Sequence, residues 1–302
     1  MIRIIDDIVV EVKANYILWQ GGSGKMKTTI YIHIQKTGGT TLRSILRHQY
    51  DRRYGGNELY NLEDIEKHFG QLITKDGRRK VVSGHMAFGA HQRVEGDTRY
   101  ITMLRNPVER VLSYYYYLIE RGNKSCRYIK ENELDVAGYV RDGLCWQGIP
   151  HTNNLQTRLL SGAGNTVPIG ECTEEMLEQA KQNVEERFAV VGFTEAFDTS
   201  ILLMRRELGW GLPTYWYQNK TSSRPRKDDL PASTVDVIKK YNDLDSKLYA
   251  FCKERFQRKV AATDLSTDRC LLRVGNAVYE PAVKGYVELR KAYNWMTGRE
   301  QW

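Results

Sequence analysis

The sequence predicts an α/β fold in three layers, with a central parallel β-sheet flanked by helices on both faces. Short runs rich in β-branched and aromatic residues alternate with longer segments in which apolar residues recur every three or four positions. Strands separated by helices favour a parallel sheet, because each crossover helix packs on one face of it. With 302 residues, 41% of them apolar, the chain can form one large α/β domain or two small ones.

The strands are expected where the β-branched runs occur, and the helices between them. The predicted strands are residues 28–34, 80–83, 100–104 and 189–193. Helices are expected to begin after residue 41 and at Pro107, and over residues 61–69, 173–187 and 194–208, the last with Phe197, Ile201, Met204 and Leu208 as its buried stripe. One long helix is expected from Pro231, buried through Val237, Tyr241, Leu244, Leu248 and Phe251.

The segment His33–Thr41, HIQKTGGTT, joins the first predicted strand to the first helix. Gly38 and Gly39 let the backbone approach a ligand closely. The N–H groups and the positive end of the helix dipole at a helix start attract an anion. The order of strand, glycine-containing turn and helix therefore predicts a phosphate site in a P-loop-like fold.

The position of Lys36 distinguishes this loop from a nucleotide triphosphatase P-loop. That motif is G-x-x-x-x-G-K-[ST], with the lysine after the loop and a hydroxyl on Mg²⁺. Here Lys36 precedes the glycines, and no acidic run follows a second strand. Gly21–Lys25 has the wrong spacing and is interpreted as a flexible connector. A metal-free phosphate site is favoured over a kinase.

A second segment, Tyr100–Tyr117, repeats the order of strand, turn and helix. Pro107 suits the first position of a helix, and Val108, Leu112, Tyr115 and Ile119 are expected to form its core face. Arg105 ends the strand, and Ser113 lies off that face, one to two turns along. A guanidinium and a hydroxyl suit a phosphate, although an exposed arginine and a solvated serine would give the same pattern.

The two segments together resemble the carbohydrate sulfotransferases, most closely the heparan sulfate 6-O type. YIHIQKTGGTTL, residues 31–42, resembles their 5′-phosphosulfate loop, and YITMLRNPVERVLSYYYY their 3′-phosphate motif. The resemblance implies transfer of a sulfuryl group from 3′-phosphoadenylyl sulfate (PAPS) to a sugar hydroxyl, with 3′,5′-bisphosphoadenosine (PAP) as product. It implies that Arg105 and Ser113 hold the 3′-phosphate. It assigns the 5′-phosphate to Lys36, Thr37, Gly38, Gly39, Thr40 and Thr41, with Lys36 also at the leaving group.

A sugar hydroxyl needs a general base, and histidine is the usual base near neutral pH. His85 follows the predicted strand at residues 80–83, and strand carboxyl ends line ligand crevices in such sheets. SGHMAFG, residues 83–89, also resembles the family segment with the catalytic histidine. A histidine that merely ends a strand is the competing interpretation. His33 is the second candidate, and His91 is an acceptor candidate, while His48, His68 and His151 are interpreted as ordinary surface or helix residues.

Two further segments, residues 153–162 and 190–210, also resemble stretches of these sulfotransferases. Asn154, Gln156 and Arg158 are acceptor candidates, although helix packing and capping would explain them equally well. Gln156 and Arg158, two residues apart, cannot point the same way on a helix.

The basic tract Asn219–Asp229 lies where the family has a loop that closes over the 3′-phosphate. The resemblance makes Lys220, Thr221, Ser223 and Arg224 secondary cofactor candidates. A solvated charge run is the competing interpretation.

The net charge of +8 favours an anionic partner, and a bisphosphorylated nucleotide meets that need. Nucleic acid is disfavoured, because no helix-turn-helix, zinc-finger or RNP pattern occurs and the basic residues are scattered. No metal is expected, because lysine, arginine and backbone N–H groups supply the positive field. Five cysteines without C-x-x-C pairs favour a reducing compartment over a disulfide framework.

Residues 28–258 carry the resemblance and are expected to form the sulfotransferase domain. Residues 1–27 are interpreted as an N-terminal extension or linker, and residues 259–302 as an extension packing on the same domain. No secretory signal and no run of ~20 apolar residues occurs, so we expect no membrane span. A cytoplasmic protein is expected, or a Golgi-lumen one if the chain is a truncated animal form.

Two other functions fit the same residues. A P-loop kinase or phosphotransferase would need ATP and Mg²⁺. A non-catalytic anion- or glycan-binding protein would keep the loop without the chemistry. The acceptor is expected to be a hydroxyl compound, with a glycan favoured by the resemblance, and neither its identity nor the oligomeric state follows from the sequence.

Overall fold

The computed structural model describes residues 27–50, 81–94, 96–122, 124–143, 150–164, 166–216, 225 and 229–297, and side chains up to residue 289 except 286 and 287. The helix predicted at residues 61–69 and the N-terminal extension before residue 27 lie outside these ranges.

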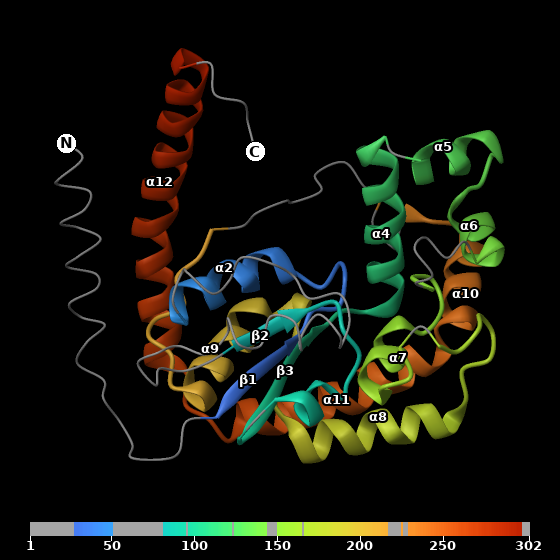
Figure 1. Cartoon of the computed structure of the whole chain (residues 1–302), viewed down its shortest axis with the longest axis horizontal. Coiled ribbons are helices and arrows are strands. Elements are labelled where there is room, and N and C mark those ends of the chain that lie inside the picture. The colour runs from blue at the N-terminus through green and yellow to red at the C-terminus, as the bar shows by residue number, and fades with distance from the viewer. Residues whose placement is uncertain are drawn as a thin grey trace.

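A parallel sheet forms the centre of the molecule, in the order β2-β1-β3-β4 within the described ranges (Figure 1). Helices cover both of its faces, so the predicted α/β class with a flanked parallel sheet is confirmed. Each strand lies within two residues of its predicted position. The strands are β1 (Thr28–Ile32), β2 (Val81–Gly84), β3 (Thr98–Leu104) and β4 (Phe188–Phe193).

The helices follow the strands as crossovers or extend the layers. The described helices are α2 (Gly39–Gln49), α4 (Pro107–Arg121), α5 (Lys124–Glu131), α6 (Val136–Asp142), α7 (Leu155–Ser161), α8 (Glu174–Arg187), α9 (Phe197–Leu208), α10 (Ala232–Tyr241), α11 (Asp243–Ala261) and α12 (Ser266–Thr297), with short 3₁₀ turns η2 (Ala90–Arg93) and η3 (Thr194–Ala196).

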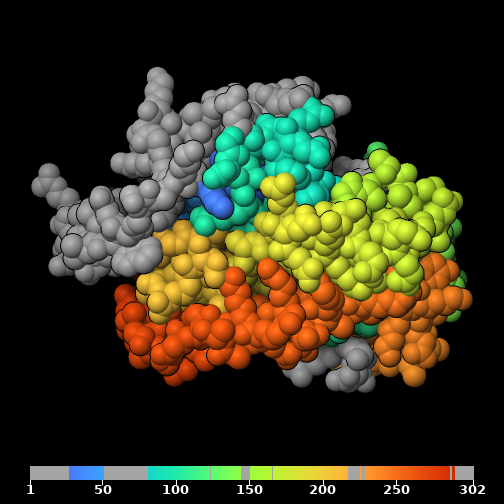
Figure 2. All heavy atoms as spheres, turned by 90° about the horizontal axis from the view of Figure 1, so that it is seen from below, coloured from blue at the N-terminus to red at the C-terminus, as the bar shows by residue number. Residues whose placement is uncertain are grey.

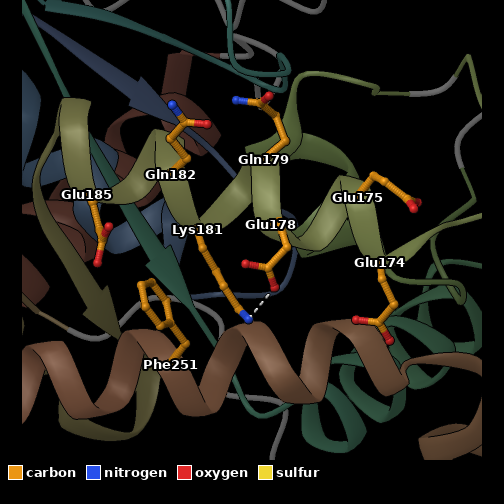
Figure 3. A pocket seen from close by; sticks show the side chains of 8 residues that line it. All are labelled: Glu174, Glu175, Glu178, Gln179, Lys181, Gln182, Glu185 and Phe251. Carbon is orange, nitrogen blue, oxygen red and sulfur yellow. Dashed lines mark hydrogen bonds and ion pairs between the residues drawn. The ribbon is translucent and has the colours of Figure 1, made fainter.

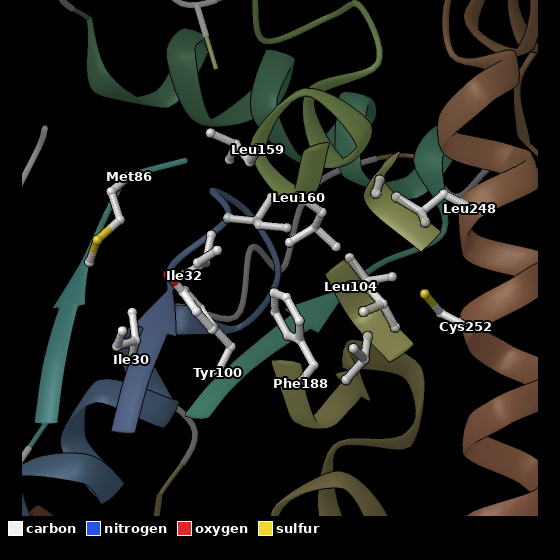
Figure 4. Packing of buried hydrophobic residues seen from close by; sticks show 14 of the residues in the cluster. Ile30, Ile32, Met86, Tyr100, Leu104, Leu159, Leu160, Phe188, Leu248 and Cys252 are labelled. Carbon is white, nitrogen blue, oxygen red and sulfur yellow. The ribbon is translucent and has the colours of Figure 1, made fainter. Parts of the chain in front are cut away.

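One face of the sheet packs against α7, α8 and α11. Alternate strand residues point to this side, since successive side chains of a strand face opposite ways. Ile30, Ile32, Tyr100 and Leu104 meet Leu248 and other apolar side chains there (Figure 4). Seen from below, α8 in yellow-green and α11 in orange run side by side across this face (Figure 2).

The opposite face packs against α2, α9 and α12. Tyr31, Ile101 and Met103, the intervening strand residues, are fully buried there. The buried stripe predicted for the helix after β4 is confirmed, because all four of its apolar residues are buried. None of the described helices is both long and apolar enough to cross a membrane.

A third apolar cluster lies beyond the carboxyl ends of the strands, where α4 packs on α6 and α10. Val108 and Leu112 of α4 are buried there, as predicted. The predicted core face is wrong in its other half, because Tyr115 and Ile119 are only half-buried while Ser113 is buried. The covered surface of α4 is wider than predicted, because α4 also packs against α5 through the buried Tyr114 and Leu118.

The single long helix predicted from Pro231 is wrong, because the chain breaks at Asn242 between α10 and α11. Asn242 is fully buried with φ −133° and ψ 37°. Its amide nitrogen donates to the carbonyls of Thr152 (2.8 Å) and Ile238 (3.0 Å), and its Oδ1 accepts from the Asn154 N–H (3.1 Å). The contacts with Thr152 and Asn154, about 90 residues away, override the local apolar period.

The carboxylate of Asp245, on α11, holds the start of α7. It is fully buried and accepts hydrogen bonds from the backbone N–H of Gln156 (3.1 Å) and Thr157 (2.7 Å) and from the Thr157 hydroxyl (2.9 Å). In return, Asn154 accepts a bond from the Asp245 N–H (3.1 Å). A negative charge at a helix start also suits the helix dipole.

Replacing Asp245 by alanine is therefore expected to lower the free energy of unfolding by about 3 kcal/mol or more, because three buried donors lose their acceptor. Asp243→Ala is the matched control. The Asp243 carboxylate is exposed and its ion pair with Lys247 is long, at 3.9 Å, so loss of this carboxylate is expected to cost less than about 1 kcal/mol. Urea unfolding followed by circular dichroism measures both. Equal losses in the two variants would contradict this role of Asp245.

Candidate functional site

Parallel strands bring the predicted site residues to one edge of the sheet. The labelled strands β1, β2 and β3 run towards α4 (Figure 1). Ile32 pairs with Gly84 on one side and with Thr102 on the other, so β1 and β2 end level and β3 continues two residues further. His33 and His85, the residues that follow β1 and β2, therefore lie next to each other, and the His33 N–H donates to the Gly84 carbonyl (2.8 Å).

The loop after β1 turns tightly before α2 begins. Lys36 has φ 67° and Gly38 has φ 80°, both left-handed. The buried hydroxyl of Thr37 donates to the Ile34 carbonyl (2.7 Å) and so closes the turn. No side chain caps the start of α2, and no acidic residue lies in its first turn. Because the first N–H groups of a helix lack intrahelical acceptors, this start suits an anion.

His33 occupies the space beside Gly39. A Cβ atom on Gly39 would lie 1.7 Å from the His33 Nε2, which no side chain tolerates. The His33 ring is buried and stacks on the Tyr31 ring, with centroids 5.5 Å apart. Gly39 is therefore required by the packing of His33 and not only by approach to a ligand.

The ring of His85 is held in one orientation by its neighbour His33. Its Nδ1 lies 2.6 Å from the His33 carbonyl, and its ring stacks on the His33 ring with centroids 4.2 Å apart. A carbonyl oxygen only accepts, so Nδ1 carries the proton and neutral His85 has its lone pair on Nε2. This tautomer can take a proton at Nε2.

Two cations lie beside the loop. The Arg105 Nη1 donates to the Lys36 carbonyl (3.1 Å), and its Nη2 lies 3.6 Å from a carboxylate oxygen of Glu109. The Lys36 Nζ lies 3.9 Å from the centre of the Tyr117 ring, a cation–π contact. Lys36 and Arg105 thus meet α4 at residues 117 and 109.

Ser113 lies between these two contacts on α4. Glu109, Ser113 and Tyr117 are spaced four apart, so they share one face of the helix. Ser113 is buried, whereas Thr40 at the start of α2 is exposed and Thr41 is buried. The predicted Arg105–Ser113 pair therefore lies along the side of α4 that carries the contacts of the loop.

His91 lies elsewhere. Its backbone N–H and Nδ1 both meet the Tyr100 hydroxyl, at 2.8 and 2.9 Å, near the start of β3. Burial and the nearby charge of Arg187, at the end of α8, lower its pKa. The structure thus separates this acceptor candidate from the carboxyl edge.

Asn154 and Arg158 are used inside the protein, in the packing and capping roles that the sequence left open. Asn154 bonds to α11 as described above. The fully buried Arg158 donates to the Asn153 carbonyl (2.9 Å), the Asn153 side chain (2.9 Å) and the Pro168 carbonyl (2.7 Å). Gln156 instead bonds to the backbone of Arg105. The secondary cofactor candidates Lys220, Thr221, Ser223 and Arg224 lie outside the described residues.

His151 is a residue of this region that sequence reasoning missed. It is buried, not a surface residue as predicted, and its ring packs on Tyr114 with centroids 4.1 Å apart. Its carbonyl accepts from the fully buried Arg110 (2.6 Å). Burial, together with the charges of Arg110 and His85, holds the His151 pKa well below its usual value. No local signal marks it, since its neighbours come from α4 and β2.

A hollow of about 550 Å³ lies along α8 and beside α11, and none of the site residues described above lines it (Figure 3). Its lining includes Glu174, Glu175, Glu178 and Glu185, with Phe251 of α11. This acidic lining suits a phosphorylated ligand poorly. Within the described ranges, no three His, Cys, Asp or Glu side chains are grouped to hold a metal ion.

Gly39→Ala is expected to lower the free energy of unfolding by about 1–3 kcal/mol, the usual penalty of overpacking, because the new methyl group displaces the His33 ring. In a His33→Ala background the same change is expected to be nearly neutral, since the obstructing ring is gone. Urea unfolding of the unchanged protein, the two single variants and the double variant gives the coupling free energy between residues 33 and 39. An equal penalty in both backgrounds would contradict the packing argument.

The low pKa of His151 makes stability depend on pH. Below about pH 6.5 the unfolded chain binds a proton at this histidine that the folded chain does not. The free energy of unfolding therefore decreases as the pH is lowered, by at most about 1.4 kcal/mol per pH unit. His151→Gln is expected to flatten this part of the curve. Urea unfolding between pH 7.5 and 5 measures it, and parallel curves for the two proteins would contradict the assignment.

Comparison with known proteins identifies relatives over most of the chain. The family model described as galactose-3-O-sulfotransferase matches residues 22–277, so the match extends past the predicted boundary at residue 258. Galactose-3-O-sulfotransferase 3 of Bos taurus is 26% identical over 264 residues, 79% of this chain and 58% of that protein. The chain thus spans just over half the length of this relative.

Heparan sulfate sulfotransferases also match. The 6-O-sulfotransferase 1-B of Danio rerio is 30% identical over 184 residues, 53% of this chain and 44% of that protein. The 2-O-sulfotransferase of Caenorhabditis elegans is 29% identical over 215 residues, 64% of this chain and 62% of that protein. The resemblance to carbohydrate sulfotransferases is confirmed, and the matching family model is the galactose-3-O type. The chain therefore belongs to the galactose-3-O-sulfotransferase family.

Proposed function

We propose that the protein is a sulfotransferase that moves a sulfuryl group from PAPS to a hydroxyl group of a carbohydrate acceptor. The observation that carries the proposal is that Lys36, Arg105 and His85 all follow the carboxyl ends of strands at one edge of the sheet, those of β1, β3 and β2. The family match supports a carbohydrate acceptor. The names of the relatives support it as well, because they refer to galactose, heparan sulfate or galactosylceramide.

The residues present fit a doubly phosphorylated nucleotide. The start of α2 offers backbone N–H groups, without a side-chain cap or an acidic residue in its first turn. Lys36 and Arg105 add two positive charges beside it. Glu109 forms an ion pair with Arg105 (3.6 Å), and as an i,i+4 partner it orients the guanidinium.

When bound, PAPS supplies an activated sulfuryl group. The residues of this chain would accept the proton, stabilise the leaving group and bind the two phosphates. Nε2 of His85 accepts the proton of the acceptor hydroxyl, while the His33 carbonyl fixes the tautomer. The ammonium of Lys36 offsets the negative charge that develops on the leaving group, as preorganised donors do. The N–H groups of residues 37–41 bind the 5′-phosphate, and Arg105 with Ser113 binds the 3′-phosphate.

We further propose that the reaction needs no metal ion, because the two cations and the helix start supply the positive field. PAP would be the nucleotide product. The hydroxyl position and the sugar that accept the sulfuryl group stay open within the carbohydrate class.

His85→Ala is expected to lower the rate of sulfuryl transfer at least ~100-fold, the usual contribution of a general base, while PAP still binds. His48→Ala, an exposed histidine on α2, is the matched control and is expected to keep full activity. Labelled PAPS with a panel of galactosides, glycosaminoglycans and glycolipids measures the rate, and calorimetry measures PAP binding. Full turnover by His85→Ala would overturn the base assignment.

The same assay separates the other two functions. Sulfuryl transfer is expected to persist in EDTA, whereas a kinase would consume ATP and stop without Mg²⁺. A non-catalytic binding protein would bind PAP or a glycan and transfer nothing from PAPS to any acceptor in the panel.

A further inference from the structure

Gln156 continues the hydrogen bonding of β3 past the end of the strand. Its Oε1 accepts from the Arg105 N–H (3.0 Å), and its Nε2 donates to the Arg105 carbonyl (3.1 Å). The side chain is fully buried. One amide thus pairs with both backbone groups of a single residue, as a neighbouring strand would.

Gln156 is itself firmly held. Its own N–H bonds to the buried carboxylate of Asp245, which also binds the next residue of α7. Asn154, just before α7, exchanges bonds with Asn242 and Asp245. The Gln156 side chain therefore projects from a helix start that α11 fixes at several points.

Arg105 connects this restrained segment to the loop at residues 33–41. Its Nη1 donates to the carbonyl of Lys36, a residue whose left-handed backbone needs external support. With its backbone fixed by Gln156 and its guanidinium between Lys36 and Glu109, Arg105 keeps little freedom. The order of contacts runs from α11 through Gln156 and Arg105 to the loop.

We propose that Gln156 is a positioning residue that presents Arg105 to the 3′-phosphate of the nucleotide, and not an acceptor contact. The inference rests on the proposed function and deepens it by assigning the Asn153–Gly162 segment to the nucleotide half of the site. An acceptor role fits poorly, because the amide oxygen and one amide N–H already serve the Arg105 backbone inside the protein.

Making both hydrogen bonds to the Arg105 backbone requires the amide group of a glutamine at residue 156. A methionine has a similar volume but replaces neither hydrogen bond. A glutamate keeps the length but cannot donate to the Arg105 carbonyl when ionised, and it brings a second carboxylate towards the guanidinium. Both changes are expected to loosen Arg105 without removing its charge.

The test compares PAP with adenosine 5′-phosphate, which lacks the 3′-phosphate, by calorimetry on the whole chain. In Gln156→Met and Gln156→Glu the Kd for PAP is expected to rise about tenfold or more, while the Kd for adenosine 5′-phosphate changes less than about threefold. Gln182→Glu, the same change on the exposed face of α8, is the matched control and is expected to alter neither value.

Arg105→Ala separates failure of this inference from failure of the proposed function. If Arg105→Ala keeps the preference for PAP, the proposed 3′-phosphate contact is wrong. If Arg105→Ala loses the preference and both Gln156 variants keep it, Gln156 does not position Arg105. An equal rise of both Kd values in the Gln156 variants would show general loosening and would overturn the inference.

A double variant tests whether Gln156 acts through Arg105. In the Arg105→Ala background, Gln156→Met is expected to cause no further loss of PAP preference, because the group that it positions is gone. Additive losses of preference would contradict the coupling.

Discussion

The register of β1, β2 and β3 is the constraint on which the rest of the site depends. Parallel pairing sets Ile32 opposite both Gly84 and Thr102, and the next residues of β1 and β2 are the two stacked histidines. Because a one-residue slip would turn every side chain to the other face, the register also decides which strand residues meet α11 and which meet α2. The apolar layers and the polar edge are thus fixed by one set of backbone hydrogen bonds.

What the sequence could predict is what depends on near neighbours. The strands, the glycine turn at residues 33–41 and the Arg105–Ser113 spacing all follow from local periods and turn chemistry. The break at Asn242 and the place of His151 depend on partners tens of residues away. No period within a helix could show that α4 packs on two sides, or that an asparagine interrupts an otherwise regular apolar stripe.

Buried polar side chains close to the site hold distant segments of the chain together. Asn242, Asp245 and Gln156 are all fully buried, and each is bonded to a segment far along the chain. A buried polar group is tolerated when its hydrogen bonds are made, and is then specific about its partners. Gln156, within the segment 153–162, makes two such bonds to the backbone of Arg105.

The hydrogen bond from His85 to the His33 carbonyl has a consequence for the order of events. Since Nδ1 is committed to that carbonyl, a proton enters and leaves the ring through Nε2 alone. In the proposed reaction the sulfated product would lie at that same nitrogen when transfer ends. The ring would then return its proton to water only after the product departs, so release of the acceptor and recovery of the base would be a single kinetic event.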